Sequence, residues 1–355
     1  MTGASLPIPL SVITGFLGSG KTTLLNRLLA HPEMGETAVL INEFGEIGLD
    51  HLLVRELSED VVLLNSGCLC CSMRGDLVDS LRDLFLKRVH GTVPEFKRAV
   101  IETTGLADPA PIIHTLMTDP LIGARYRLDG IVTTVDAVFG AGQLSDHVEP
   151  VKQAAVADRL VLTKTDIAEA ATVGDLRHRL RALNPGAPMI VSADGAVAPN
   201  DLFGCGLFDA AGKNPDVERW LNAEAYEDDR HHHAHDVNRH DAHISAFCLT
   251  IDKPVAWQGL VMWLEMLLAT HGESLLRVKG ILNVEDQDTP VAIHGVQHVF
   301  HPPVTLPAWP DGERRSRIVF ITRDMGRAAI EATFHAFADA FETPADPADP
   351  PGTLR

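Results

Sequence analysis

The first 205 residues alternate between short apolar runs and longer amphipathic stretches. The runs are apolar at consecutive positions, as is typical of strands covered on both faces. They read LSVIT, AVLINEF, VVLLNSG, RAVIETTG, GIVTTVDA, RLVLTKTD and PMIVSAD. This pattern predicts an α/β domain with a doubly wound, mainly parallel sheet, whose ligands lie beyond the carboxyl ends of the strands.

A second set of elements follows residue 243. HISAFCLTID, SLLRVKGILNV, PVAIHGVQHVFH and RIVFIT have the composition of strands, and residues 257–272 and 325–341 have a helical pattern. We expect a small α+β domain over 244–342 with the order β-α-β-β-α-β, the split βαβ or ferredoxin-like arrangement.

Two other segments lack such patterns. Residues 206–243 are acidic and rich in Gly and Pro, and they hold six histidines between His231 and His243, which indicates a linker. Its histidines suit a low-affinity metal collector, and the alternative is a solvated polar linker. Residues 343–355 are rich in Pro and Asp, so we expect a disordered tail.

Charge and composition exclude several classes of partner. With 30 Lys and Arg against 48 Asp and Glu, the net charge of −18 argues against nucleic acid or an anionic membrane as the main partner. The longest apolar stretch, Leu260 to Thr270, is interrupted by Glu265 and is too short for a membrane span. No basic residue precedes Lys21, so a secretory signal is not expected. Three of the five cysteines lie within four residues, which favours reduced thiols in a cytoplasmic protein.

The strongest motif is the G-x-x-x-x-G-K-T sequence that begins at Gly15. It follows a predicted strand and precedes an amphipathic helix, which is the context of a phosphate-binding P-loop. Lys21 is expected to reach the β- and γ-phosphates, and Thr22 to bind Mg²⁺. The motif predicts that the nucleotide is bound by Gly15, Gly18, Ser19, Gly20, Lys21, Thr22 and Thr23.

Two further strand ends can complete this site. Glu102 can hold the water shell of Mg²⁺ and Gly105 can offer its N–H to the γ-phosphate; the alternative is a simple strand end. In the sequence Thr163-Lys164-Thr165-Asp166, Asp166 can accept hydrogen bonds from guanine N1 and N2 while Lys164 lies over the base. The alternative for this segment is a plain helix cap.

A cluster of cysteines follows another predicted strand. Cys68, Cys70 and Cys71 supply three soft ligands within one turn of backbone, suited to Zn²⁺, Co²⁺ or Cu⁺, and leave a fourth coordination position open. Buried structural cysteines or a redox role are the alternatives.

The segment from Asn42 to Asp50 places carboxylates between glycines after the second predicted strand. It is a candidate switch loop, in which Glu43 or Asp50 orients the attacking water and Glu43 is alternatively a metal ligand. The alternative is a solvated acidic turn without a functional role. Lys21, Glu43 and Glu102 are thus the candidate catalytic residues.

Five motifs in this order, GFLGSGKTTLLNRLL, NEFGEIGLD, GCLCC, ETTGLADP and LTKTD, resemble the CobW-type metallochaperone GTPases, also called zinc-regulated GTPase metalloprotein activators. The resemblance covers residues 9 to about 205, and the segment after 243 resembles the C-terminal domain of that family. It implies a GTPase domain over 1–205 with GTP and Mg²⁺ as cofactors. It further implies that zinc or cobalt binds at Cys68, Cys70 and Cys71 and is handed to an acceptor metalloprotein.

The chain departs from the family at Thr163, where the family usually has an Asn that hydrogen-bonds near guanine N7 and steadies the P-loop. The shorter Thr predicts weaker guanine selectivity, with Lys164 and Asp166 keeping the main contacts. Two other functions remain as alternatives: a metal buffer or sensor with weak NTPase activity, and a P-loop small-molecule kinase or ATPase. A homo-oligomer is compatible with the sequence.

Overall fold

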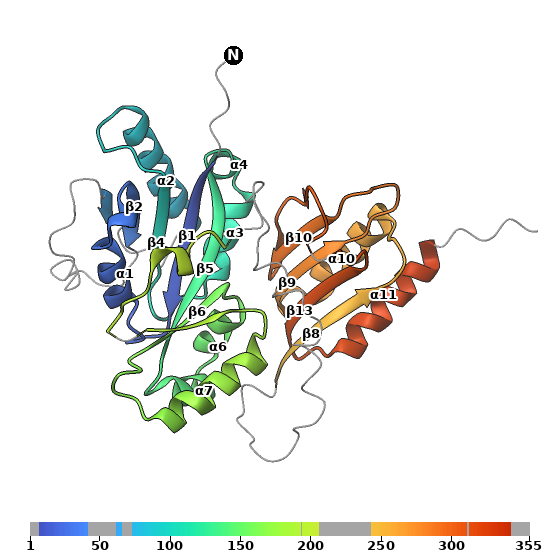
Figure 1. Ribbon diagram of the computed structural model, residues 1–355. Coiled ribbons are helices and arrows are strands. Elements are labelled where there is room, and N and C mark those ends of the chain that lie inside the picture. The colour runs from blue at the N-terminus through green and yellow to red at the C-terminus, as the bar shows by residue number, and fades with distance from the viewer. Residues whose placement is uncertain are drawn as a thin grey trace, which may run out of the picture.

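The computed structural model describes residues 7–41, 62–65, 73–192, 194–205, 243–310 and 312–341. Within them, the first domain is built on a seven-stranded parallel sheet with the order β3-β2-β4-β1-β5-β6-β7 (Figure 1). The strands are β1 (Ile8–Gly15), β2 (Thr37–Ile41), β3 (Val62–Asn65), β4 (Arg98–Glu102), β5 (Tyr126–Asp136), β6 (Arg159–Thr163) and β7 (Met189–Val191). The prediction of a parallel α/β sheet is confirmed, and each strand falls on one of the apolar runs.

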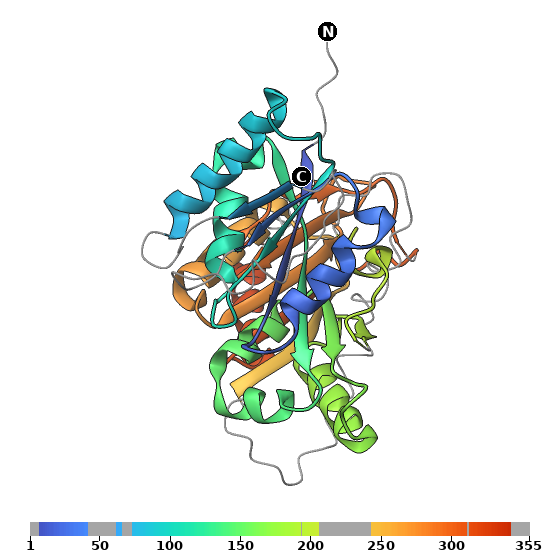
Figure 2. The same ribbon diagram turned by 90° about the vertical axis from the view of Figure 1, so that its left-hand side faces the viewer.

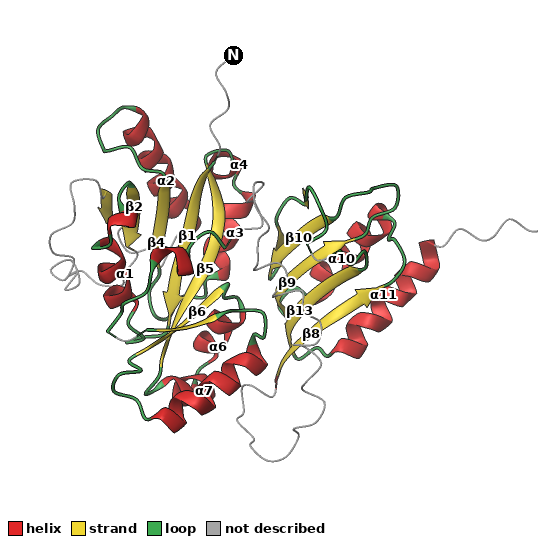
Figure 3. Ribbon diagram, in the orientation of Figure 1, coloured by secondary structure: helices red, strands yellow, loops and turns green. Residues whose placement is uncertain are grey.

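Helices cover both faces of this sheet, as the runs of consecutive apolar residues require (Figure 3). They are α1 (Lys21–Leu29), the 3₁₀ helix η1 (Pro32–Met34), α2 (Met73–Val89), α3 (Ala110–Thr118), α4 (Pro120–Gly123), α5 (Gly140–Asp146), α6 (Val148–Ala155), α7 (Ala170–Leu183) and α8 (Pro199–Leu202). Leucines of α1 pack with Val100, Val132 and Val161 on one face. On the other face, α2 and α3 pack on Leu10, Leu40 and Ile101.

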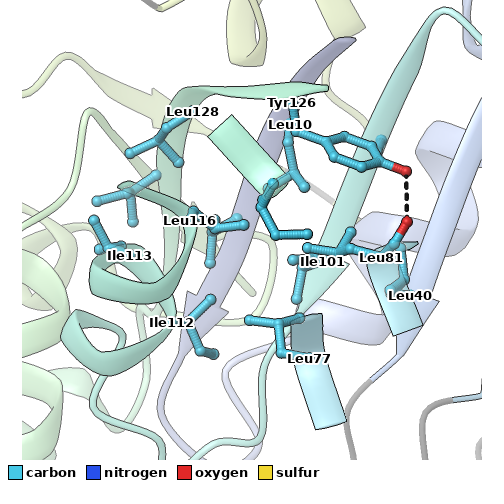
Figure 4. Close-up of a cluster of buried hydrophobic side chains, with 14 of the residues drawn as sticks. Leu10, Leu40, Leu77, Leu81, Ile101, Ile112, Ile113, Leu116, Tyr126 and Leu128 are labelled. Carbon is cyan, nitrogen blue, oxygen red and sulfur yellow. Dashed lines mark hydrogen bonds between the residues drawn. The ribbon is translucent and has the colours of Figure 1, made fainter. Parts of the chain in front are cut away.

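Figure 4 shows the core under α2 and α3. Tyr126 is buried among the leucines and isoleucines there, and its hydroxyl donates to the carbonyl of Leu81 at 3.1 Å. Burial raises the pKa of Tyr126, so this hydroxyl stays protonated and remains a donor. The bond fixes α2 against the start of β5.

The second domain is a mostly antiparallel sheet with the order β11-β10-β9-β13-β8, and β12 pairs with β10. Its elements are β8 (Ile244–Ile251), α10 (Trp257–His271), β9 (Leu275–Leu282), β10 (Val291–Val296), β11 (Val299–Phe300), β12 (Val304–Thr305), β13 (Ser316–Arg323) and α11 (Arg327–Phe341). Both helices pack on one face of the sheet around Trp263 and Phe320.

The predicted small α+β domain is confirmed, but its predicted element order is wrong. α11 coincides with the helix predicted over residues 325–341 and follows the last strand, so the helices and strands were placed correctly but the stated order β-α-β-β-α-β does not describe them. Between β10 and β13 the chain carries Pro302, Pro303, Pro307 and Pro310, which remove backbone donors and exclude a helix. A short strand pairing, β12 with β10, occupies that connection instead.

The C-terminal sheet turns its other face toward the first domain, and viewed from the left of Figure 1 it lies behind that domain (Figure 2). Leu276 and Ile321 join the core formed by α6 and α7, while Val296 joins the core under α2 and α3. The interface is therefore apolar at two separate places.

Of the predicted linker only His243 is described, and the predicted tail lies outside the described residues.

Candidate nucleotide-binding site

The P-loop joins the carboxyl end of β1 to the start of α1. Gly15, Gly18 and Gly20 all have positive φ angles, of 142, 70 and 89°. At Gly15 a Cβ atom would lie 2.2 Å from Oγ1 of Thr134 on β5, so this position requires glycine. The first turn of α1 carries no acidic residue, which leaves the positive end of the helix dipole suited to an anion.

The predicted phosphate ligand Lys21 is 9% exposed and folds back over the loop. Its Nζ donates to the carbonyl of Gly15 at 2.9 Å and to that of Phe16 at 3.1 Å. These bonds hold the ammonium group beside the backbone N–H groups that form a phosphate cradle. Ser19 is buried, and its hydroxyl lies 2.7 Å from the hydroxyl of Thr134, whereas Thr23 is exposed.

Glu102 and Thr22 meet at the same edge of the sheet. The Thr22 hydroxyl donates to Oε1 of Glu102 at 2.8 Å, and Glu102 is 1% exposed. β4 carries Glu102 to this point because it is hydrogen-bonded to β1, with Ile13 opposite Glu102. A hydroxyl and a carboxylate are oxygen ligands of the kind that Mg²⁺ prefers, so these residues fit a magnesium ion.

The loop after β4 lies directly on the P-loop. A Cβ atom at Gly105 would come within 2.7 Å of the backbone nitrogen of Leu17, so only glycine allows this approach. The loop is tied to β1 as well, because the N–H of Thr103 donates to the carbonyl of Ile13 at 3.0 Å. Gly105 therefore lies beside the loop that would hold the phosphates.

The predicted base loop begins where β6 ends. The Thr163 hydroxyl donates to the carbonyl of Ser19 at 2.7 Å, and Thr163 is 4% exposed. Lys164 has a φ angle of 57°, and its Nζ donates to Oδ2 of Asp136 at 2.6 Å. Asp166 is exposed to solvent, as a residue that reads a base must be.

The sequence analysis missed Asp136 and the turn after β7. Asp136 is 1% exposed, accepts from Lys164 and also caps the next turn through the N–H groups of Val138 and Phe139. The available signal was an acidic residue at the carboxyl end of the predicted strand GIVTTVDA. The second feature is a polar turn whose Ser192 carbonyl accepts from the Thr165 hydroxyl at 3.2 Å, which ties the base loop to β7.

Several predicted residues lie outside the described part of the chain: Glu43, Cys68, Cys70, Cys71 and the rest of the segment from Asn42 to Asp50. Among the residues that are described, no group of three or more His, Cys, Asp or Glu side chains could hold a metal ion. A search of the same residues finds no helix long and apolar enough to cross a membrane.

Known proteins match this chain along most of its length. The profile of the CobW/HypB/UreG nucleotide-binding domain matches residues 9–191, and that of the cobalamin synthesis protein CobW C-terminal domain matches residues 244–338. The zinc chaperone YjiA of Escherichia coli K12 is 34% identical over 328 residues, which cover 92% of this chain and 98% of YjiA. The zinc-regulated GTPase metalloprotein activator 1 of Schizosaccharomyces pombe is 29% identical over 321 residues, covering 83% of this chain and 76% of that protein.

Solved structures agree with this result. The crystal structure of Zn(II)-bound YjiA GTPase from E. coli superposes with a TM-score of 0.70 at 28% identity, over 94% of this chain and 99% of that one. A Zn(II)-bound triple mutant of the same GTPase gives a TM-score of 0.72 at 29% identity, with the same coverage. From its two matched domains, its P-loop geometry and these relatives, the chain belongs to the CobW/HypB/UreG family of P-loop GTPases and carries a CobW-type C-terminal domain.

Proposed function

We propose that this GTPase is a metallochaperone that binds zinc, or cobalt, at Cys68, Cys70 and Cys71 and transfers the ion to an acceptor metalloprotein. The relatives named as zinc chaperones support the choice of zinc. Cobalt is retained because three thiolates accept either ion.

The observation that carries this proposal is the register of three neighbouring strands. Glu102, which contacts Thr22, pairs with Ile41 on β2, and Ile41 pairs with Asn65 on β3. Neighbouring strands lie about 4.8 Å apart, so the end of β3 is roughly 10 Å from Glu102. Cys68 follows Asn65 by three residues. Asn65, the last described residue before the cysteines, therefore lies at the same edge of the sheet as the phosphate site, which supports a cysteine site near the nucleotide.

Mg·GTP would be held by the residues that already contact one another at that edge. Lys21 would exchange its carbonyl partners for phosphate oxygens, and Thr22 with Glu102 would face the magnesium ion. A bound Mg²⁺ supplies charge neutralisation at the β- and γ-phosphates. Gly105 would donate its N–H to the γ-phosphate, and Lys164 and Asp166 would bind guanine.

The loop from Asn42 to Asp50 follows β2, which lies between the strands that lead to the two sites. In our proposal the γ-phosphate orders this loop, with Glu43 near the thiols, so that Mg·GTP tightens metal binding relative to Mg·GDP. Linkage then requires that the metal tighten GTP by the same factor. Hydrolysis would loosen the ion while an acceptor is docked.

The test is a set of zinc competition titrations with Mg·GTPγS, Mg·GDP or no nucleotide. Cys70→Ser should lower zinc affinity by at least the roughly 10- to 100-fold that loss of an outer-shell partner costs, because a hydroxyl is not deprotonated at neutral pH. Nucleotide binding should survive. Cys248→Ala, in the core of the second domain, is the matched control and should keep wild-type zinc affinity.

Two results would contradict the proposal. Zinc affinity that is unchanged in Cys70→Ser would remove the cysteine site. Equal zinc affinity with GTPγS and GDP would leave a passive metal buffer with GTPase activity, without a driven transfer.

A further inference from the structure

Helix α6 holds the loop that follows β4 through side-chain hydrogen bonds. Gln153 on α6 is fully buried, and its Nε2 donates to the carbonyls of Gly105 at 3.1 Å and Ala107 at 3.0 Å. Lys152, also on α6, forms a second contact with the loop: its Nζ donates to Oδ2 of Asp108 at 2.8 Å. These contacts hold the loop that carries Gly105, which packs on Leu17 of the P-loop, against α6.

Asp108 is also in contact with the C-terminal domain. Nε2 of Gln297 donates to Oδ2 of Asp108 at 3.4 Å, the same oxygen that accepts from Lys152. The other carboxylate oxygen accepts from the N–H of Ala110 at 3.0 Å, at the start of α3. One half-buried carboxylate thus connects the loop, α6 and α3 with a residue 189 positions away in the sequence.

The residue that reaches Asp108 lies at the tip of the hairpin formed by β10 and β11. Gln297 follows the last residue of β10 and has a left-handed φ angle of 49°, a conformation that turns the chain tightly. The preceding residue, Val296, is 2% exposed and packs in the core of the first domain with Ile113 and Leu116 of α3. The hairpin is therefore seated on α3, and its tip is held at the loop.

We propose that Gln297 is a positioning residue for nucleotide hydrolysis: through Asp108 it keeps the loop from Thr103 to Asp108 in the position in which Gly105 meets a γ-phosphate. This inference rests on the role proposed above for Gly105 and is independent of the zinc site. It assigns the C-terminal domain a part in sensing whether the nucleotide carries its third phosphate, because GDP has no group to meet Gly105.

The test compares Gln297→Met, which keeps the length of the side chain and removes the amide, with Gln287→Met as its matched control. Gln287 is exposed in the connection between β9 and β10, at the opposite end of β10 from the hairpin tip. Affinities for Mg·GTPγS and Mg·GDP are measured by titration. At 3.4 Å this bond is long, so we take the contribution of an ordinary hydrogen bond, which predicts a roughly two- to tenfold fall in GTPγS affinity for Gln297→Met, with GDP affinity unchanged. Gln287→Met should behave as the wild type.

A second experiment distinguishes loss of the contact with Asp108 from disturbance of the hairpin by Gln297→Met. Asp108→Ser keeps an oxygen that can cap α3 but is too short to reach Gln297. Adding Gln297→Met to Asp108→Ser should cause no further loss of GTPγS affinity, because the two residues act through one contact. In hydrogen exchange, GTPγS should protect amides 296–300 more than GDP does, and Gln297→Met should abolish the difference.

The inference is wrong if Gln297→Met lowers GDP and GTPγS affinities equally, if it leaves both unchanged, or if its effect adds fully to that of Asp108→Ser. Lys21→Ala tests the P-loop assignment separately from the role of Gln297. If Lys21→Ala leaves nucleotide binding intact, the P-loop assignment itself is wrong. If Lys21→Ala abolishes nucleotide binding, the P-loop assignment stands, and a negative result with Gln297→Met then contradicts only the role proposed for Gln297.

Discussion

At the scale of single residues, Thr163 is the position at which the sequence is expected to depart from the family, and the structure shows which groups its side chain contacts. A hydroxyl carries one proton, and Thr163 directs it to the carbonyl of Ser19 inside the P-loop. Its side chain also lies where a Cβ atom on Gly20 would meet it, at 3.4 Å. Thr163 therefore stabilises the P-loop, and in the function that we propose guanine is recognised by other groups such as Asp166.

Replacing Thr163 with Val keeps the shape of the side chain and removes this donor. The net value of such a hydrogen bond is about 0.5–1.5 kcal/mol, so GDP and GTP affinities should fall together by roughly two- to tenfold. Thr163→Ser retains the hydroxyl and should stay close to the wild type. Titration with fluorescent nucleotides measures both. Wild-type affinities in Thr163→Val would show that the hydrogen bond does not matter, and a loss confined to Thr163→Ser would show that the methyl contact does.

At the scale of elements, the loop after β4 packs directly on the P-loop, because Gly105 carries no side chain at the point of contact with Leu17. Gly105 lies so close to Leu17 that the loop after β4 and the P-loop form one packed unit. Gln153 closes this unit from α6. A γ-phosphate bound to one loop is thereby within reach of the other.

Gly105→Ala should push these loops apart. Overpacking of a tight contact costs about 1–3 kcal/mol, which corresponds to a loss of roughly five- to 150-fold in kcat/KM for GTP if the whole cost is felt in the transition state. GDP binding should change much less. Gly174→Ala, inside α7 and with no atom within 4 Å of the new methyl group, is the matched control and should keep full activity. Steady-state phosphate release provides the measurement, and wild-type kcat/KM for Gly105→Ala would contradict the packing argument.

At the scale of the whole molecule, the two domains are joined by buried charges. Arg277 and Lys279 on β9 both donate to Asp158, which precedes β6 and is 6% exposed as a residue. Burial alone raises the pKa of Asp158, but the charges of Arg277 and Lys279 outweigh burial and lower it to about 2. Removing one member of such a buried group typically costs 3–5 kcal/mol, so the cluster holds the domains in one arrangement.

Two buried histidines lie beside this cluster. His294 and His301 stack with their ring centroids 4.7 Å apart, and among the described residues Nε2 of His294 has no hydrogen-bond partner. Burial and then the charge of Arg277 lower the pKa of His294 well below its usual value. Burial, assisted by Arg277 and Lys279 and opposed by Asp158, lowers that of His301 to about 4. Both rings are neutral at pH 7.

The folded protein should therefore lose stability as the pH falls from 7 to 5. The pKa of His301 in the folded state lies below its ordinary value of 6.5, so the unfolded chain binds more protons in this window and the free energy of unfolding decreases. At pH 5 the loss from this one histidine is about 2 kcal/mol. His301→Phe keeps an aromatic ring and removes the titration, so its unfolding free energy should depend less steeply on pH. Urea unfolding of both proteins at pH 7.5 and 5.0 measures this difference. If the unfolding free energy changes equally with pH in the wild type and in His301→Phe, then His301 binds protons equally in the folded and the unfolded chain, and the prediction is wrong.

The fold of each domain and the phosphate motif are visible in the sequence because they depend on residues close together along the chain. Seven apolar runs predict the seven strands of the parallel sheet, and the glycines, Lys21 and Thr22 of the P-loop lie within one short segment of backbone. The helices and strands of the second domain were also predicted at their observed positions, and the prolines between β10 and β13 agree with the absence of a helix among the described residues there. Local pattern and local chemistry were sufficient for these features.

Tertiary structure decided which distant residues cooperate. Asp158 and Arg277 are 119 positions apart, and Asp108 and Gln297 are 189 apart, and each looks like an ordinary surface residue in its own segment. Nothing in the periodicity of one segment identifies its partner in another, because periodicity reports only which face of an element is buried. Which buried faces meet depends on how the C-terminal sheet docks on α3, α6 and α7, and that docking brings Gln297 to the loop beside the P-loop.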